Sequence, residues 1–317
     1  MVQVLLTGAS GFLGRHILRL LAGQPGVRVT TASRSAASRS TATHSGAGGA
    51  VGHVQLNFGV DGPDRVGELL AELGPDVVVN CAGAVAGSTA ELAEANIVGP
   101  ATLVHAMLRH APTTRLIHLG SAAEYGATAP GVAIAESTPA RPVGDYGATK
   151  LAGTSLVTLA RSAGLDALTL RVFNPVGSGA PANSLPGRLA AEIRRATAEG
   201  DVVRLGPLDA VRDFVDAHDV AAAVWQAVTA AATSLVSTLD LPVLNVGSGR
   251  GVAVRELVDV LVRIADFRGK IVESATGSTR SASVPWQCAD ISAIGAALGW
   301  RPRTSLIASL DDLWQAV

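Results

Sequence analysis

The feature that most constrains the fold is a glycine-rich turn near the start of the chain. It follows a short apolar run, Val2–Leu6, which predicts a strand, and it reads GASGFLG from Gly8 to Gly14. The next residues, RHILRLLAG, predict a helix. Small residues allow a tight turn and let the backbone approach a pyrophosphate, while the free N–H groups of a helix start attract phosphate. Strand, turn and helix together are the fingerprint of a dinucleotide-binding Rossmann unit.

Strand and helix patterns alternate along the chain after this turn. Their alternation indicates a parallel sheet, and the apolar content of the strands indicates burial on both faces. We therefore predict an α/β fold, a Rossmann doubly wound parallel sheet with a smaller C-terminal α/β substrate-binding lobe. The further strands are predicted at Val27–Ala32, Val54–Leu56, Asp76–Asn80, Leu116–Leu119 and Ala167–Val172.

A Gly/Pro-rich stretch that begins at Asn174 indicates a crossing into the second lobe. Beyond it, helices are predicted at Arg188–Glu199 and Glu256–Ala265, and a strand at Val243–Val246. We assign residues 1–172 and 213–243 to the Rossmann domain, and residues 173–212 and 244–317 to the substrate-binding domain. Ser33–Gly52 lacks periodicity and is predicted to be a long loop, with a poorly formed helix as the alternative.

Composition excludes several classes of protein. The net charge is −1 with no basic block, which gives no support for binding to nucleic acid. No apolar segment is long and clean enough to span a bilayer. The two cysteines, Cys81 and Cys288, lie far apart and indicate neither a disulfide framework nor a zinc site, and no metal site is predicted. Because the first strand starts near Met1, we expect no signal peptide and a cytoplasmic location.

The end of the second predicted strand bears on the choice of cofactor. A site selective for NAD usually carries an acidic residue there, which binds the ribose 2′-OH. This chain has Ser33 and Arg34 instead. A hydroxyl beside a guanidinium suits a 2′-phosphate, so NADP(H) is favoured, although NAD(H) is possible. Arg39, in the same segment, is a rival for the phosphate.

A tyrosine and a lysine four residues apart, Tyr146 and Lys150, are the predicted acid–base pair. Side chains at this spacing share one face of a helix. An ammonium near a phenol hydroxyl stabilises the phenolate, so Tyr146 could exchange a proton near neutral pH. Ser121 follows a predicted strand and completes a Ser–Tyr–Lys proton-transfer site.

With these motifs in place, the chain resembles an extended short-chain dehydrogenase/reductase, the group of nucleotide-sugar epimerases, dehydratases and ketoreductases. Nearly the whole length takes part in the resemblance. The matching segments are TGASGFLG, NCAG from Asn80, NIVG from Asn96, LGSAAEYG from Leu119, RVFNP from Arg171, RDFVDAHDV from Arg212, LNVGSG from Leu244 and LGW from Leu298.

The resemblance implies roles for individual residues. Ser121 would hydrogen-bond the substrate oxygen, Tyr146 would be the acid or base, and Lys150 would also hold the nicotinamide ribose. Asn57 and Phe58 would contact adenine, although Asn57 replaces the usual Asp. The cofactor would be contacted by Gly8, Gly11, Phe12, Leu13, Gly14, Ser33, Arg34, Asn57, Phe58, Cys81, Ala82, Gly83, Asn96, Tyr146, Lys150 and Phe173. The substrate would be contacted by Ser121, Ala122, Glu124, Asn174, Arg188, Arg212 and Arg280.

The residues after Ser121 bear on the reaction. In related 4,6-dehydratases these positions carry an acidic residue, because elimination of water needs a further acid and base. Here they are Ala122 and Ala123, which cannot move protons. Glu124 and the segment Val203–Asp216 are most similar to GDP-4-keto-6-deoxy-D-mannose reductases. The resemblance therefore implies NADPH-dependent reduction of a nucleotide-linked 4-keto-6-deoxyhexose, with the proton supplied by Tyr146.

Other functions stay open at this point. A C4 epimerase with retained NAD would use the same Ser–Tyr–Lys set, and a ketoreductase could act on another natural-product carbonyl. A non-catalytic NADP-binding sensor is disfavoured, because it would have no need for Ser121, Tyr146 and Lys150. The family also suggests a homodimer through the helices that start near Asn96 and Tyr146.

Overall fold

The computed structural model describes residues 1–34, 51–231, 242–274 and 284–316. Its centre is a seven-stranded sheet in the order β11-β6-β5-β4-β1-β2-β3, in which every neighbouring pair is parallel. The predicted Rossmann fold is confirmed. The strands are β1 (Val2–Thr7), β2 (Val27–Ser33), β3 (Val51–Gln55), β4 (Val77–Asn80), β5 (Arg115–Ser121), β6 (Ala167–Val172) and β11 (Val243–Val246).

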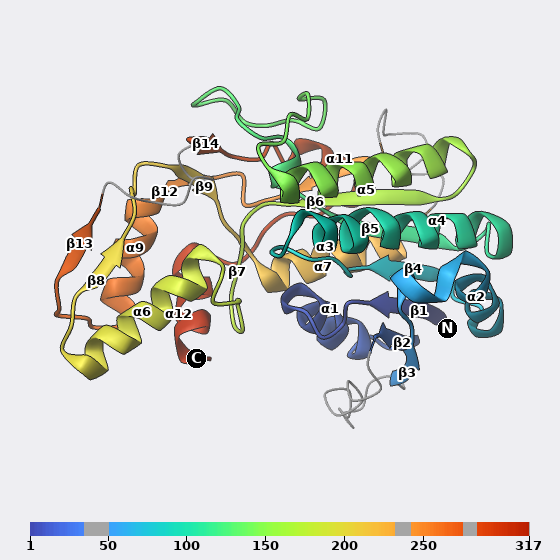
Figure 1. Cartoon of the computed structure of the whole chain (residues 1–317), viewed down its shortest axis with the longest axis horizontal. Helices are drawn as coiled ribbons and strands as arrows, with labels where there is room; N and C mark the ends of the chain where they lie inside the picture. Colours follow the sequence, from blue (N-terminus) through green and yellow to red (C-terminus); the bar gives the residue numbers. More distant parts are fainter. Residues whose placement is uncertain (35–50, 232–241, 275–283, 317) are drawn as a thin grey trace.

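Helices cover both faces of this sheet (Figure 1). On one face α1 (Phe12–Ala22), α7 (Ala217–Thr229) and α11 (Ser292–Leu298) pack on alternate strand residues such as Leu6 and Ile117. On the other, α2 (Phe58–Leu73), α4 (Gly99–His110) and α5 (Asp145–Ser162) pack on the intervening residues such as Leu5 and Leu116. Because side chains alternate between the faces of a strand, these continuous apolar runs serve two cores at once.

The second lobe lies beyond the carboxyl ends of the sheet strands (Figure 1). It has its own buried core of aliphatic side chains, which includes Leu189, Ile193 and Leu257. Its helices are α6 (Leu185–Glu199), α9 (Val254–Ile264) and α12 (Leu306–Gln315). Its short strands include β8 (Val203–Leu205), β9 (Val211–Asp213), β12 (Gly251–Ala253), β13 (Ile271–Glu273) and β14 (Trp286–Gln287), and β7 (Pro175–Val176) pairs with β10 (Val215–Asp216) between the lobes.

Two details differ from the predicted elements. β3 begins at Val51, earlier than the predicted Val54, and most of the predicted loop, residues 35–50, lies outside the described residues. The predicted domain boundary at residue 243 falls on the first residue of β11, yet the whole of β11 pairs with β6 in the main sheet. Ile294 and Trp300 also belong to the core of that sheet. The Rossmann unit therefore takes in segments beyond residue 243.

Two acidic residues of the RDFVDAHDV segment hold distant parts of the chain together. Asp213 is fully buried and accepts hydrogen bonds from the backbone N–H groups of Ser248, Gly249 and Ala289, at 2.6, 3.0 and 3.0 Å. Asp219 accepts from the N–H groups of two residues that follow the LGW segment. Asp213 and Asp219 of this motif therefore have structural roles in the fold.

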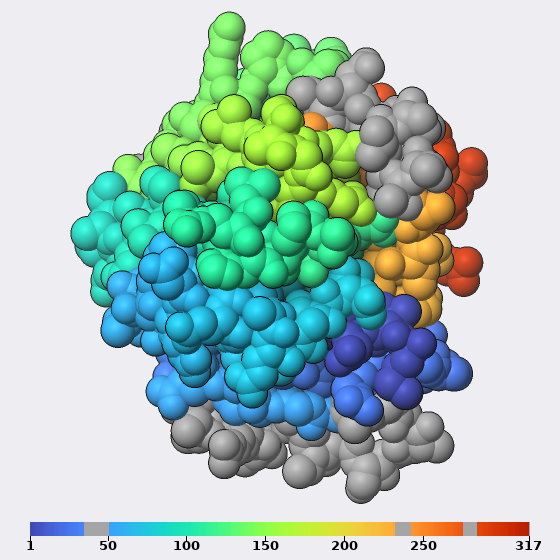
Figure 2. All heavy atoms as spheres, turned by 90° about the vertical axis from the view of Figure 1, so that its right-hand side faces the viewer, coloured from blue at the N-terminus to red at the C-terminus, as the bar shows by residue number. Residues whose placement is uncertain are grey.

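The end of the molecule away from the second lobe is built mainly from the first half of the chain (Figure 2). The amino-terminal ends of the sheet strands lie there, with later residues along one edge. No helix among the described residues is long and apolar enough to cross a membrane.

Candidate active site

The order of the strands creates a crevice between β1 and β4. From β1 the chain winds toward β2 and β3, whereas β4, β5, β6 and β11 lie on the other side. In doubly wound sheets ligands bind at such a switch point, outside the carboxyl ends of the strands. The glycine turn after β1 and the loop after β4 both lie there.

The three glycines of the turn have different physical roles. Gly8 has a φ of +69°, and a Cβ there would lie 2.6 Å from the backbone of Ala82. A Cβ on Gly14 would lie 2.1 Å from the carbonyl oxygen of Gly8. Gly11 is exposed and would meet only that oxygen, at 3.2 Å. Gly8 and Gly14 thus allow the turn itself, while Gly11 leaves space on its outer surface.

The helix that follows offers a site for phosphate. α1 begins at Phe12 with Gly11 as its N-cap residue and has no side-chain cap. Its first N–H groups, on Phe12 and Leu13, therefore lie beside the open surface of Gly11. Such a terminus binds phosphate through N–H groups and the helix dipole, so the cradle fits a dinucleotide.

The loop after β4 is held in place by buried amides. The side-chain oxygen of Asn80 accepts from Thr7 Oγ1 at 2.7 Å and from the Ala82 N–H at 3.2 Å. Asn96, 1% exposed, bonds to both the N–H and the carbonyl of Ala84. This clamp fixes the loop, so Asn96 acts on the predicted cofactor site through Ala84. Gly83 is exposed between the two amides, and a Cβ there would lie 2.8 Å from Asn96 Oδ1.

Cys81 in the same loop is chemically inert. Burial raises the pKa of its thiol to about 12, against a smaller opposing effect of the Lys150 charge. The thiolate is the reactive form of cysteine, so Cys81 has no nucleophilic role near neutral pH. Its surface is half-buried, which leaves it available for packing.

The predicted cofactor-selecting residues lie at the carboxyl end of β2. Ser33 is half-buried and Arg34 is exposed, and the Arg34 carbonyl accepts from Gln55 Nε2 at 3.1 Å. Asn57 is the N-cap of α2, because its side chain accepts from the Gly59 N–H at 3.2 Å. Arg39 lies outside the described residues.

Ser121 ends β5 and caps a single 3₁₀ turn, Ala122–Glu124. Its Oγ accepts from the Ala123 N–H at 3.2 Å, and its own N–H donates to Glu124 Oε1 at 2.7 Å. Ala122 is buried, whereas Ser121 is half-buried.

Helix α5 brings Tyr146 and Lys150 to this turn. A Cβ on Gly147 would lie 2.5 Å from the Ala123 carbonyl oxygen, so only glycine lets the helix start pack against the Ser121 turn. Lys150 is 7% exposed, and its ammonium donates to the Leu119 carbonyl oxygen at 2.6 Å. Burial lowers the pKa of Lys150, and the Glu124 charge opposes this. Tyr146, one turn earlier on the same face, is half-buried.

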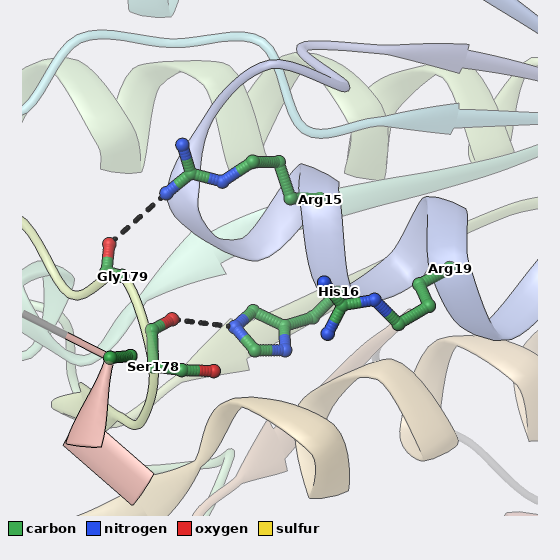
Figure 3. A pocket seen from close by; sticks show the side chains of 6 residues that line it. Arg15, His16, Arg19, Ser178 and Gly179 are labelled. Carbon is green, nitrogen blue, oxygen red and sulfur yellow. Dashed lines mark hydrogen bonds between the residues drawn. The ribbon is translucent and has the colours of Figure 1, made fainter. Parts of the chain in front are cut away.

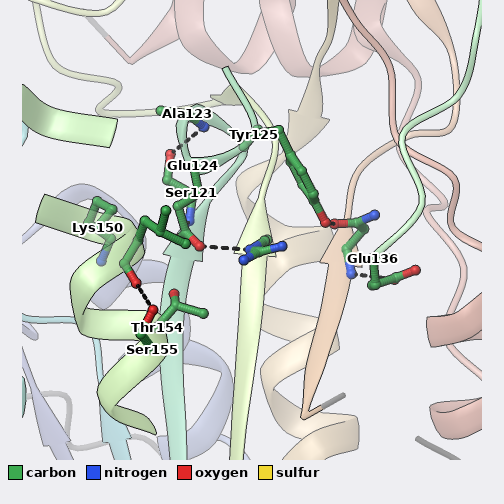
Figure 4. Close-up of polar contacts among 12 residues, drawn as sticks. Ser121, Ala123, Glu124, Tyr125, Glu136, Lys150, Thr154 and Ser155 are labelled. Carbon is green, nitrogen blue, oxygen red and sulfur yellow. Dashed lines mark hydrogen bonds and ion pairs between the residues drawn. The ribbon is translucent and has the colours of Figure 1, made fainter. Parts of the chain in front are cut away.

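Two predicted contacts are corrected by burial. Glu124 is completely buried, with one oxygen bonded to Ser121 N–H and the other paired with Arg171 Nε at 2.7 Å (Figure 4). It has no surface to offer a substrate. Phe173 is also completely buried and packs on Tyr125, with ring centroids 6.2 Å apart, so its side chain cannot touch a cofactor.

The predicted substrate residues are spread over the junction of the lobes. Asn174 donates through Nδ2 to the Asp213 carbonyl at 2.8 Å, and Arg188 is exposed on α6. Arg212 on β9 is 9% exposed, and burial lowers the pKa of its guanidinium. It donates to the Val211 carbonyl and forms no ion pair with any described residue. Arg280 lies outside the described ranges.

A separate small pocket lies between α1 and the segment that crosses into the second lobe (Figure 3). His16 Nε2 lies 2.9 Å from the Ser178 carbonyl oxygen, and Arg15 Nη2 donates to the Gly179 carbonyl at 3.1 Å. None of Ser121, Tyr146 and Lys150 lines this pocket. Its residues join the cofactor helix to the crossing segment.

Residues 4–247 match the family described as "NAD dependent epimerase/dehydratase family". The chain belongs to this family. The predicted family and enzyme class, an NAD(P)-dependent enzyme, are thereby confirmed.

Individual relatives cover almost the full length. The chain is 35% identical to a dTDP-6-deoxy-L-talose 4-dehydrogenase (NAD(P)(+)) of Kitasatospora kifunensis, over 99% of this chain and 95% of the relative. It is 26% identical to the GDP-6-deoxy-D-mannose reductase of Pseudomonas aeruginosa, over 88% and 85%. A UDP-glucose 4-epimerase of Thermotoga maritima, solved with UDP-glucose, has the same fold with a TM-score of 0.84 and 20% identity, over 99% and 98%.

Three residues that shape the site escaped the sequence analysis. Gly147 lies between Tyr146 and Lys150 in the motif. A glycine inside a predicted helix is a signal of close packing, which here is the contact with the Ser121 turn. Arg171 occurs in the RVFNP segment, and its partner Glu124 lies 47 residues away. Asp213 occurs in the RDFVDAHDV segment, and its partners lie 35 or more residues away. No local signal indicates those pairings.

Proposed function

We propose that this enzyme catalyses NADPH-dependent reduction of a nucleotide-linked 4-keto-6-deoxyhexose to the 4-alcohol. The observation that carries the proposal is the turn after β5. This turn packs against the start of α5, which bears Tyr146 and the buried Lys150, and it has alanines where a dehydratase needs an acid. The 35% identity to a sugar 4-dehydrogenase supports the same choice, since oxidation and reduction at C4 are one reaction in opposite directions.

Each residue has a distinct part in the proposed step. A bound NADPH would supply the hydride that adds to the ketone carbon. Tyr146 donates its phenolic proton to the ketone oxygen, and the Ser121 hydroxyl donates a hydrogen bond to that oxygen. The Lys150 ammonium, anchored on the Leu119 carbonyl, stabilises the tyrosinate that remains. One hydride and one proton convert the ketone into the alcohol.

Arg212 is suited to the nucleotide diphosphate. A buried guanidinium without an ion-pair partner among the described residues is costly unless an anion compensates for it. A diphosphate supplies negative charge and oxygens that match the planar fork of arginine. Thymidine diphosphate is the first nucleotide to test, since the relative with 35% identity acts on a dTDP sugar.

Dehydration is disfavoured by the geometry of the same turn. Elimination of water across C5 and C6 needs a second acid and base beside the sugar. Ala122 and Ala123 occupy the two positions after Ser121, and Glu124, the next residue, is sealed inside the protein. No carboxylate of this turn reaches the site.

A C4 epimerase is the alternative that the site itself does not distinguish. It would use Ser121, Tyr146 and Lys150 with a retained NAD, and a solved epimerase shares the fold. We favour the reductase because no acidic residue follows β2 and because the relative with the higher identity is a dehydrogenase. The homodimer through the helices near Asn96 and Tyr146 likewise stays a proposal.

The preference for NADPH can be reversed at the end of β2. The double variant Ser33→Asp with Arg34→Ala places a negative charge where we put the 2′-phosphate and removes its cation. The ratio of kcat/KM with NADPH to that with NADH should fall more than about tenfold, since this needs only about 1.4 kcal/mol. Arg28→Ala, an exposed arginine on the same strand, is the matched control and should leave the ratio unchanged. An unchanged ratio in the double variant would place the phosphate elsewhere.

The proposed function is tested with a panel of sugars. NADPH oxidation is followed with 4-keto-6-deoxyhexoses linked to dTDP, GDP and UDP, and each product is identified by mass and by NMR. We expect turnover with at least one of them and formation of the 4-alcohol. Formation of a 4-keto-6-deoxy product from dTDP-glucose or GDP-mannose would contradict the proposal and indicate a dehydratase.

A further inference from the structure

A buried ion pair between Glu124 and Arg171 lies beside Ser121 and takes no direct part in the proposed reaction. Glu124 is inaccessible to solvent, and its two oxygens have different partners. Oε1 accepts from the Ser121 N–H and Oε2 pairs with Arg171 Nε, each at 2.7 Å (Figure 4). The carboxylate therefore connects the turn that bears Ser121 to the neighbouring strand.

Arg171 is itself fixed from two sides. It lies on β6, and its partner across the sheet is Gly120 of β5, the residue that precedes Ser121. Its guanidinium stacks on Tyr125 with 4.5 Å to the ring centroid. The Tyr125 hydroxyl in turn donates to Asn245 Oδ1 at 2.7 Å, on the next strand, β11. The partner of Glu124 is thus anchored in the rigid sheet.

Gly120 shows that space in the sheet is kept for this pair. A Cβ at Gly120 would lie 2.7 Å from Glu124 Oε1 and 3.1 Å from Arg171 Cγ. A side chain at this position would crowd both residues of the pair and also the Thr169 methyl group, which would lie 2.8 Å from the same Cβ. A buried ion pair is weak evidence for stability, because removing two charges from water offsets their attraction. A role in geometry accounts better for its place beside Ser121.

The turn that Glu124 holds is short. It consists of three residues, two of which are alanines without polar side chains, so a single 3₁₀ turn has little stability of its own. The Ser121 hydroxyl and the Glu124 carboxylate cap it reciprocally. Without the carboxylate, the Ser121 N–H would lose its acceptor and the backbone there would be free to rotate.

We propose that Glu124, with Arg171, is a positioning pair that fixes the backbone at Ser121 and thereby aims the serine hydroxyl into the active site. The inference rests on the proposed role of Ser121. Glu124 has no exposed surface for substrate or cofactor, and its hydrogen bond from the Ser121 N–H is the contact through which it acts in this proposal.

A double-mutant cycle tests this. kcat is measured for the wild type, Glu124→Gln, Ser121→Ala and the double variant. Misplacement of a catalytic group by about 1 Å can cost up to about a hundredfold, so we expect Glu124→Gln to lower kcat between about tenfold and a hundredfold. The KM for NADPH should change less than about twofold. In the Ser121→Ala background the same substitution should change kcat less than about twofold, because the residue through which it acts is gone. Equal losses of kcat in both backgrounds would overturn the proposal.

Two further variants separate positioning from folding. Asp166→Asn breaks the ion pair Arg115–Asp166, which lies at the other end of β5, about 20 Å from Ser121 by strand length. It should lower the melting temperature and leave kcat within about twofold. If Glu124→Gln fails to fold, Glu124→Met with Arg171→Met removes both charges and the acceptor of the Ser121 N–H, and replacing a buried ion pair by apolar residues often preserves stability. That variant should show the same loss of kcat, and wild-type kcat in it would overturn the proposal.

The cycle is independent of the exact substrate. It is run with whichever reaction the wild type performs, whether 4-ketone reduction, alcohol oxidation or C4 epimerisation, because the same Ser121 serves all three. Failure of the wild type to reduce any ketone would contradict the proposed function alone. Additive effects in the cycle would contradict the positioning role alone.

Discussion

Replacing Tyr146 by phenylalanine should reduce kcat at least about a hundredfold while cofactor affinity stays near that of the wild type. The ring is retained, and only the hydroxyl that carries the transferable proton is removed, so the loss should match that typical of general acid catalysis. The turnover number is measured at saturating NADPH, and the Kd for NADPH is measured by fluorescence.

The chain offers a matched control, because it has one other tyrosine. Tyr125 is fully buried and donates its hydroxyl to Asn245 at 2.7 Å. Tyr125→Phe keeps the ring on which Arg171 stacks, so it should cost about 1 kcal/mol of stability from the lost hydrogen bond and leave kcat within about twofold. A Tyr146→Phe enzyme with near-normal kcat would remove Tyr146 from the mechanism.

Replacing Lys150 by methionine should lower kcat to a similar extent, at least about a hundredfold, and should also weaken binding of NADPH. In the proposed reaction the buried ammonium stabilises the tyrosinate, and Met has a similar length but no charge. Lys270 is the only other lysine and is exposed, so Lys270→Met is the control and should leave both quantities unchanged. Turnover of Lys150→Met within about threefold of the wild type would contradict this role.

The charge of Lys150 also gives the wild type a pH dependence. Burial lowers the pKa of Lys150. An exposed lysine has a pKa of about 10.4, so the Lys150 ammonium loses its proton at a lower pH than an exposed lysine does. Raising the pH removes this cation. The rate of reduction should therefore fall on the alkaline side, beginning below about pH 10.4.

The sheet was predictable because its central strands are largely apolar. β4 and β6 are buried at every position, and a run that packs against helices on both faces is visible in sequence alone. β3 was predicted less well because it is an edge strand, half-exposed along its length, so its first residues carry no apolar pattern. The crevice at the switch point then follows from strand order, which the glycine turn after β1 already indicates.

The site was predicted in part. Tyr146 and Lys150 lie one turn apart on α5, and Ser121 ends β5, so both positions are local features of the sequence. The catalytic roles of these three residues stay a prediction. Glu124 was predicted to bind substrate, but its side chain is completely buried. A sequence pattern does not show in which direction a side chain points. Its partner, Arg171, lies 47 residues away and meets it only through the pairing of β5 with β6. Contacts of this kind depend on register between strands, which sequence periodicity does not encode.

Isotope labelling follows the proposed net transfer of one hydride from NADPH to C4 of the sugar. The enzyme is supplied with a dTDP-linked 4-keto-6-deoxyhexose and NADPH that carries deuterium at both hydrogen positions of nicotinamide C4, and the product is examined by NMR. We predict one deuterium at C4 of the alcohol for each NADPH consumed. A product without deuterium at C4, or interconversion of C4 epimers without net consumption of NADPH, would contradict the reductase and favour an epimerase.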